Sequence, residues 1–294
     1  MSTPPRRRHL VTSTVVFLAV LTGCAGPGDA VGRDSGNTSS PAPTVSLREQ
    51  LEMLPGVSEV SGGDVGMTIV MSADASRDDV LAAAKQSHTL ATETAFLSSI
   101  SLTRTGGGLD AELDAPSAFP WTIEVFPGEI EPTLDTLAGM LDVEQVPGAS
   151  GLAVVSGWPY VTITNIDDFS AVFDAVSTTA LFADGGTYST DSDRLQIVHV
   201  PNRTSAEGVH AVIDIAVDYP QAEVLLQATT AGPQWPQLYV ARLSVEEAAA
   251  IDTRLRSPEL ADTDPDGLPQ RFQLSVIGPD GPTYTLGTFG NVPG

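Results

Sequence analysis

The chain has 294 residues, of which 37 are acidic and 14 are basic, so its formal net charge is −23. This acidity argues against a nucleic-acid partner, because binding to phosphates depends on clustered Lys and Arg residues. Hydrophobic residues make up 41% of the sequence, which is enough to build a core and excludes general disorder. The single cysteine, Cys24, excludes an internal disulfide framework and a thiolate zinc cluster.

The first residues have the pattern of an export signal. Three arginines at positions 6–8 precede an apolar run over residues 10–21, and small residues follow it. About twelve apolar residues are too few to cross a ~30 Å hydrocarbon core, which needs roughly 20. A basic head, a short apolar run and small residues before the end of the segment together predict a cleaved signal peptide.

The end of this segment, Leu21-Thr22-Gly23-Cys24, resembles the lipobox of bacterial lipoprotein precursors. The resemblance implies that residues 1–23 are removed and that Cys24 receives lipid, such as palmitate. One acyl chain holds a protein only marginally, whereas two form a stable anchor at ~0.8 kcal/mol per buried CH₂. We therefore expect a lipid-anchored protein on the extracytoplasmic face of the cell membrane.

Residues 24–45 are rich in Gly, Ser and Pro and have no apolar periodicity, so we expect a flexible tether with a reach of some ~25 Å. Removal of residues 1–23 takes away three of the 14 basic residues and no acidic one, which leaves a formal net charge of −26. The composition, rich in Ala, Gly and Asp with one lysine, resembles lipoproteins of high-GC actinobacteria. That likeness implies no activity.

Helix starts are recognisable along the rest of the chain. A capping box pairs a Ser or Thr with an acidic residue three positions later. The pattern predicts four helix starts, at Ser46 with Glu49, Ser76 with Asp79, Thr204 with Glu207, and Ser244 with Glu247. Asn165 with Asp168 fits more loosely, and Glu131-Pro132 places proline in a first helical turn. Helical spacing of apolar residues follows these starts, for example at Val209, Val212, Ile213 and Ala216.

Short β-type segments separate the predicted helices. They lie at residues 67–71, 152–155, 160–164, 224–228 and 238–243. Turn-forming residues at 106–108, 191–193 and 279–281 each separate two further runs, as hairpin turns do.

The predicted order is helix, strand, strand, helix, strand, strand, three times over. We therefore expect an α+β fold of three degenerate αββαββ units, at residues 46–126, 130–200 and 204–290, with antiparallel sheets and helices packed on one face. The alternative is one α+β domain whose elements alternate. Each unit resembles a small antiparallel plait, and residues 51–57 resemble the opening of such modules in bacterial envelope and metal-handling proteins. The metal-handling version has paired cysteines, which this chain lacks, so that function is not implied.

The sequence contains no pattern typical of a catalytic or zinc site. His88, His199 and His210 are isolated rather than spaced as metal ligands, so structural roles are expected. No nucleophile elbow, phosphate-binding loop, dinucleotide turn or zinc-protease motif occurs. Catalytic triads have no fixed order in sequence, and no pattern here points to one.

One acidic stretch resembles half of a calcium loop. Asp262, Asp264 and Asp266 occupy positions 1, 3 and 5, with Gly267 at position 6. Position 12 is Gln273 where a bidentate Glu is needed, so an ordinary turn-rich connector is the preferred interpretation and calcium the alternative.

Two of the three tryptophans, Trp158 and Trp235, precede a proline at matching places in the second and third units. Both are predicted between the first two strands of their unit. An exposed tryptophan there could contact a ligand or partner, whereas the alternative is a ring folded back onto its own sheet.

Together these features predict a lipid-anchored binding or scaffold component of the cell envelope, without a cofactor. Its expected partners are the membrane, through Cys24, and a wall polymer or an envelope protein. A first alternative is an envelope hydrolase with a site built from scattered carboxylates. A second is a solute-binding subunit, which the paired strands disfavour because such proteins have parallel sheets.

Overall fold

The computed structural model describes residues 45–104, 120–190, 192, 194–201, 203–227, 236–261, 269–278 and 281–291. All of the described residues belong to one compact unit, Val45–Gly294. None of the helices in these ranges is long and apolar enough to cross a membrane.

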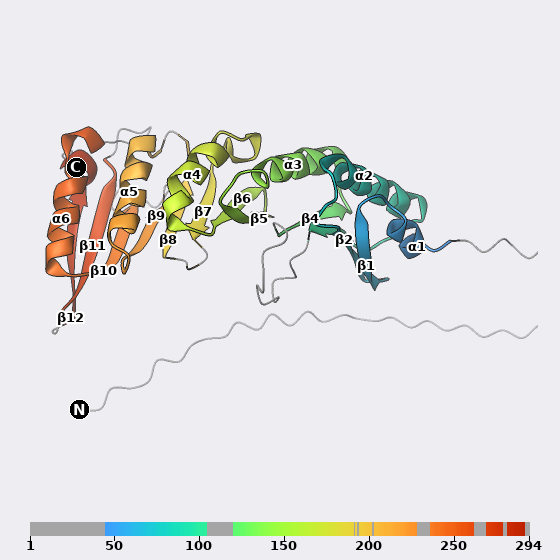
Figure 1. The fold of residues 1–294 in the computed structure, drawn as a ribbon, viewed down its shortest axis with the longest axis horizontal. Helices are drawn as coiled ribbons and strands as arrows, with labels where there is room; N and C mark the ends of the chain where they lie inside the picture. The colour runs from blue at the N-terminus through green and yellow to red at the C-terminus, as the bar shows by residue number, and fades with distance from the viewer. Residues whose placement is uncertain are drawn as a thin grey trace, which may run out of the picture. The chain divides into compact units, whose positions relative to one another are not determined.

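Six α-helices and twelve β-strands are present in this part of the chain (Figure 1). The helices are α1 (Leu47–Glu52), α2 (Arg77–Glu93), α3 (Ile130–Val143), α4 (Phe169–Ser177), α5 (Ala206–Asp218) and α6 (Val245–Leu255). The strands are β1 (Val57–Gly63), β2 (Gly66–Met71), β3 (Ile100–Arg104), β4 (Trp121–Phe126), β5 (Ala149–Val155), β6 (Trp158–Ile163), β7 (Gly186–Thr190), β8 (Leu195–His199), β9 (Glu223–Gln227), β10 (Leu238–Leu243), β11 (Arg271–Gly278) and β12 (Gly281–Thr288).

The predicted α+β class and the predicted order of three αββαββ units are confirmed. The elements α1 to β4, α3 to β8 and α5 to β12 each run helix, strand, strand, helix, strand, strand. They fall within the three predicted residue ranges, whose status as separate domains stays a prediction.

The strands form two sheets in simple sequential order. One has the order β1-β2-β3-β4, and the other runs from β12 through to β5. Within each hairpin the strands are antiparallel, whereas successive hairpins of a sheet are parallel and are joined through a helix. The smallest repeating module is therefore one helix followed by one hairpin, and it occurs six times in the described part of the chain.

The helices cover one face of the eight-stranded sheet, as predicted (Figure 1). Residues that face the helices lie opposite one another from strand to strand and are at most 5% exposed. This buried row consists of Leu152, Val161, Tyr188, Ile197, Leu226, Leu238 and Phe272. The predicted apolar stripe of α5, from Val209 to Ala216, is buried against the same layer. Because strand side chains alternate between faces, the neighbouring positions point away from the helices.

Three of the four predicted capping boxes are present, and one start is shifted by a single residue. Ser46, Ser76 and Ser244 accept the expected backbone bonds and pair with their acidic partners. Helix α5, in contrast, is capped by Ser205, whose hydroxyl accepts from the Gly208 N–H at 3.0 Å. Thr204 is buried and its hydroxyl lies 3.2 Å from the Gln270 side-chain nitrogen, so a tertiary bond replaces the predicted cap.

The turn from the first helix of each unit into its first strand is also repeated. In the first two units a Pro-Gly pair makes this turn, and Gly56 and Gly148 have φ angles of +73° and +92°. A Cβ added to Gly148 would lie 2.9 Å from Val172 Cγ2 of the unit's second helix. The third unit has Gln221 instead, and its amide donates to Glu247 at the start of α6 at 2.7 Å. In the second and third units, different residues thus connect this turn to the second helix of the unit.

At each of the two outer edge strands, β1 and β12, a backbone carbonyl accepts a hydrogen bond from an arginine of a nearby helix or helix end. Arg48 of α1 donates to the Val60 carbonyl of β1 at 2.8 Å while its Nε lies 2.9 Å from Glu52. At the opposite end Arg256, just beyond α6, donates to the Leu286 carbonyl of β12 at 3.0 Å. These bonds occupy acceptors on strands that have a neighbour on one side only.

Candidate functional site

The face of the eight-stranded sheet that points away from the helices is a candidate binding surface. We call it the open face. Side chains on it lie opposite one another across seven strands, from β6 to β12, and we call this set the cross-strand row. Its members are Thr162, Ser189, Gln196, Leu225, Tyr239, Gln273 and Leu286. All of them are partly or fully exposed, in contrast to the buried row on the helix side. At about 4.8 Å between strands, the cross-strand row extends over ~29 Å.

The cross-strand row is free of charged side chains, although acidic residues dominate the chain. Its members supply hydroxyl, amide, aliphatic and aromatic groups. By strand alternation, the charged strand residues on the same face are Glu223 and Arg271. Glu223 lies 2.5 Å from Arg242, which neutralises it. The open face is therefore a nearly neutral surface on a strongly acidic protein.

Several large apolar side chains on the open face are exposed. By the register of the hairpins, Tyr160 of β6, Ile277 of β11, and Tyr284 and Leu286 of β12 point to this side. Their exposed fractions range from 40% for Tyr160 to 69% for Ile277. Ile277, Tyr284 and Leu286 lie on two neighbouring strands and form a cluster, whereas Tyr160 lies five strands away from β11. Clustered exposed apolar side chains mark an interaction surface more often than scattered ones do.

Trp158 lies on the open face and its ring rests on its own sheet. It is the first residue of β6, directly after a turn in which Ser156 and Gly157 have positive φ. The indole Nε1 donates to Thr187 Oγ1 of β7 at 2.9 Å. The ring also approaches the backbone at Gly185, where an added Cβ would lie 2.9 Å from the indole. Trp158 remains partly exposed in this position, so its predicted contact with a partner stays a prediction.

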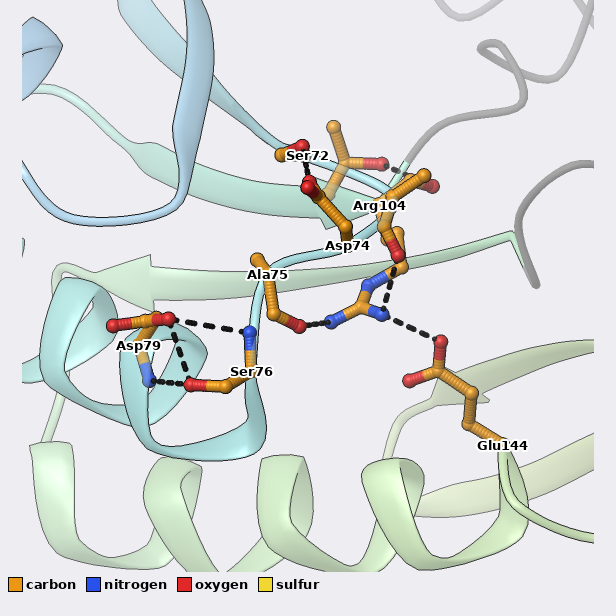
Figure 2. Close-up of polar contacts among 9 residues, drawn as sticks. Ser72, Asp74, Ala75, Ser76, Asp79, Arg104 and Glu144 are labelled. Carbon is orange, nitrogen blue, oxygen red and sulfur yellow. Dashed lines mark hydrogen bonds and ion pairs between the residues drawn. The ribbon is translucent and has the colours of Figure 1, made fainter.

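A buried ion pair joins the end of β3 to the end of α3 (Figure 2). Arg104 and Glu144 are 7% and 9% exposed and lie 2.8 Å apart. The guanidinium also donates to the backbone carbonyl of Ala75 at 3.0 Å and lies over the Trp121 ring, 5.8 Å from its centre. Burial raises the pKa of Glu144, although the Arg104 charge acts in the opposite direction.

This ion pair has the geometry of a structural connection rather than of an acid–base site. Catalytic carboxylates work in pairs or with a positioned base, in a place that a substrate can reach. Glu144 is the acidic residue with a raised pKa among the described residues, and its neighbour is a guanidinium. Sequence reasoning did not find this pair, because its members are 40 positions apart in segments with no shared pattern.

Three side chains on α4 and α5 form a Ser–His–Asp arrangement. His210 Nε2 lies 3.0 Å from Asp174 Oδ1, and His210 Nδ1 lies 3.4 Å from Ser170 Oγ. Ser170 and Asp174 are four residues apart and therefore share one face of α4. No sequence pattern distinguishes this spacing from an ordinary helix surface.

The same three residues lack the other features of a hydrolytic site. A serine nucleophile needs N–H donors directed at the developing oxyanion. Ser170 lies in a helix, where backbone N–H groups point along the axis to the preceding carbonyls. Asp174 is 59% exposed and His210 is 36% exposed, so water reaches both. The arrangement fits a surface connection between α4 and α5.

His199 lies inside the helix–sheet layer. Its ring packs edge-on against Phe173 with 5.2 Å between ring centres, and burial lowers its pKa. Phe173 also contacts Tyr188, whose pKa is raised by burial. This position agrees with a structural role. Among the described residues, no group of three or more His, Cys, Asp or Glu side chains is placed to hold a metal ion.

A groove of about 350 Å³ lies between α2 and α3. Its lining consists of Leu81, Ala82 and Lys85 from α2, and Leu134, Asp135 and Ala138 from α3. The groove therefore holds one carboxylate, whereas the hydrolase alternative requires two in one pocket.

Several predicted site residues lie outside the described residues. They are the lipidation residue Cys24, the second tryptophan Trp235, and the calcium candidates Asp262, Asp264 and Asp266. Sequence reasoning overlooked Tyr284 and Leu286, although their alternate spacing after the turn at residues 279–281 is the pattern of a half-exposed strand.

Comparison with protein-family models, with curated proteins and with solved structures finds no match to this chain, so the proposals below rest on its own residues.

Proposed function

We propose that this protein is an exported, lipid-anchored binding component of the cell envelope that presents the open face of its eight-stranded sheet to a partner. The observation that carries the proposal is the contrast between the two faces. One is buried under helices, and the other exposes Tyr160, Ile277, Tyr284 and Leu286 on a nearly neutral surface. Exposed apolar side chains of this kind are costly in water unless a partner covers them.

The sequence supports the location that this function requires. The lipobox-like segment places a lipid on Cys24, and residues 24–45 separate the anchor from the folded part. At a formal net charge of −26 the mature chain is repelled by anionic surfaces, so a covalent anchor supplies the retention that charge opposes.

The anchor is tested by metabolic labelling with radioactive palmitate. We expect the natural chain to be labelled and the Cys24→Ser variant to lose the label completely. Label that persists in the variant would contradict the lipidation proposal, whatever the variant's location.

The binding face is tested with isolated cell envelopes and the Cys24→Ser chain, in which no lipid contributes to retention. Replacing both Tyr284 and Leu286 by serine should lower the retained fraction at least fivefold. The matched control is Leu97→Ser, because Leu97 is 93% exposed but precedes β3 in the other sheet. Equal retention of all three proteins would refute the role of the open face.

A further inference from the structure

We propose that the partner of the open face is an uncharged polysaccharide chain, which lies across the strands along the cross-strand row. This inference rests on the proposed function, because it names the chemical class that the same face binds. It is carried by three observations, which are the absence of charged side chains from the cross-strand row, the mixture of groups in the row and the row's geometry.

The absence of charge is selective. The chain has 37 acidic residues, yet its cross-strand row has no charged side chain. Of the two charged strand residues on the same face, Glu223 is paired with Arg242, and Arg271 contributes one positive charge. An acidic protein surface repels anionic polymers, whereas a basic partner would be matched by carboxylates on the face. A nearly neutral surface on a chain of formal net charge −23 therefore fits an uncharged partner best.

The groups in the row match the chemistry of sugars. A sugar ring has hydroxyls around its rim and C–H groups on its faces. Ser189, Gln196 and Gln273 can donate to and accept from hydroxyls, because hydroxyl and amide groups do both. Tyr239 combines an apolar ring with a polar end, and aromatic rings pack against C–H surfaces.

The geometry of the row suits an extended polymer. Neighbouring members belong to neighbouring strands, so one side chain recurs about every 4.8 Å along ~29 Å. That interval is comparable with the length of one sugar unit. Tyr160 is the next residue on the open face after Thr162 at one end of the row, and Tyr284 is the next after Leu286 at the other, so an aromatic side chain lies beside each end.

The test is affinity electrophoresis of the detergent-solubilised full chain in gels that contain a soluble neutral β-glucan, galactan or mannan. Each polymer is paired with its carboxymethylated derivative. We expect at least one neutral polymer to retard the protein, with apparent binding at least tenfold weaker for the charged derivative. Gln273→Glu should weaken binding at least tenfold, because it places a charge within the row while nearly keeping the side-chain shape.

The control is Gln145→Glu, which adds the same charge at an exposed position beyond α3 and should bind as the natural chain does. Thermal unfolding of both variants shows that they are folded. No retardation by any neutral polymer, or equal loss in both variants, would overturn the inference. If envelope retention still depends on Tyr284 and Leu286 in that case, the proposed function stands with a protein partner instead.

Discussion

The two junctions between successive units are built from equivalent elements and differ in their outcome. At the first junction α3 connects β4 to β5, and at the second α5 connects β8 to β9. In each, an arginine of the preceding hairpin holds the end of the connecting helix. Arg104 bonds to the side chain of Glu144, just beyond α3. Arg194 instead donates to two backbone carbonyls, that of Ala216 in α5 and that of Tyr219 just after it.

Backbone pairing across the junctions begins in the same way. The Leu152 N–H of β5 donates to the Pro120 carbonyl at 3.1 Å, and the Val224 N–H of β9 donates to the Arg194 carbonyl at 2.8 Å. The second junction then continues as a parallel ladder between β8 and β9, but the first does not. Proline has no N–H to give to a ladder, and β5 carries an irregularity near Gly151. The module order alone therefore does not decide whether two sheets become one.

The largest expected effect concerns the first junction. Arg104→Met leaves the Glu144 carboxylate buried without its partner, which should lower the free energy of unfolding by about 3–5 kcal/mol. Urea denaturation monitored by circular dichroism measures the loss. The double variant Arg104→Met/Glu144→Leu should regain most of it, since both charges are then absent. A double variant as unstable as the single one would show that the ion pair is not the cause.

The next effect concerns the exit from the connecting helix. Gly148→Ala forces a side chain into positive φ, at about 1–2 kcal/mol, and within 2.9 Å of Val172. A total loss of about 2–3 kcal/mol is expected in urea denaturation. Gly157 is the matched control because its φ is +80° but no atom lies within 4 Å of an added Cβ. Equal losses at the two positions would rule out the packing contribution.

A smaller effect is expected at the second junction. Arg194→Met removes the donor to two helix-end carbonyls that water can partly replace, so about 1–2 kcal/mol should be lost. Hydrogen exchange should accelerate at the end of α5 while β11 stays protected.

Arg242→Met removes an exposed ion pair with Glu223 and should change stability by about 0.5 kcal/mol or less. A larger loss of stability for Arg242→Met than for Arg194→Met would contradict the expectation that the Arg194 bonds contribute more than this ion pair.

The smallest effect is a pH dependence near the second junction. Because the pKa of His199 is lowered in the folded protein, the unfolded chain binds more protons between that pKa and its ordinary value of 6.5. Stability from this group is therefore present above pH 6.5 and declines as the pH falls through that range. His199→Gln should flatten the stability–pH curve there, as urea midpoints at successive pH values will show. An unchanged slope would contradict the attribution.

The sequence predicted the fold well where the signals are local. Capping serines, alternating strands and turn residues act within a few positions, so the order of helices and strands could be inferred. Thr204 shows the limit of this reasoning. Its spacing to Glu207 is correct for a cap, but a contact with Gln270, 66 positions away, takes its hydroxyl.

Long-range pairing could not be predicted in the same way. The register that joins β8 to β9 and the contact of Arg104 with Glu144 depend on tertiary packing between segments with independent patterns. The candidate site has the same origin, since the cross-strand row draws one residue from each of seven strands. Trp158 could be singled out from the sequence, because tryptophan is rare in it, but the bond of its indole to Thr187 could not be predicted.

Two arginines, one from α1 and one just beyond α6, each bond to the outermost strand of their sheet. Each hairpin presents an edge that the next module can extend, so a free edge is a template for growth by another molecule. Arg48 occupies the Val60 carbonyl at one end and Arg256 the Leu286 carbonyl at the other. Each bond removes one acceptor from an edge that another strand could otherwise pair with, which makes the addition of a further module from a second molecule less favourable.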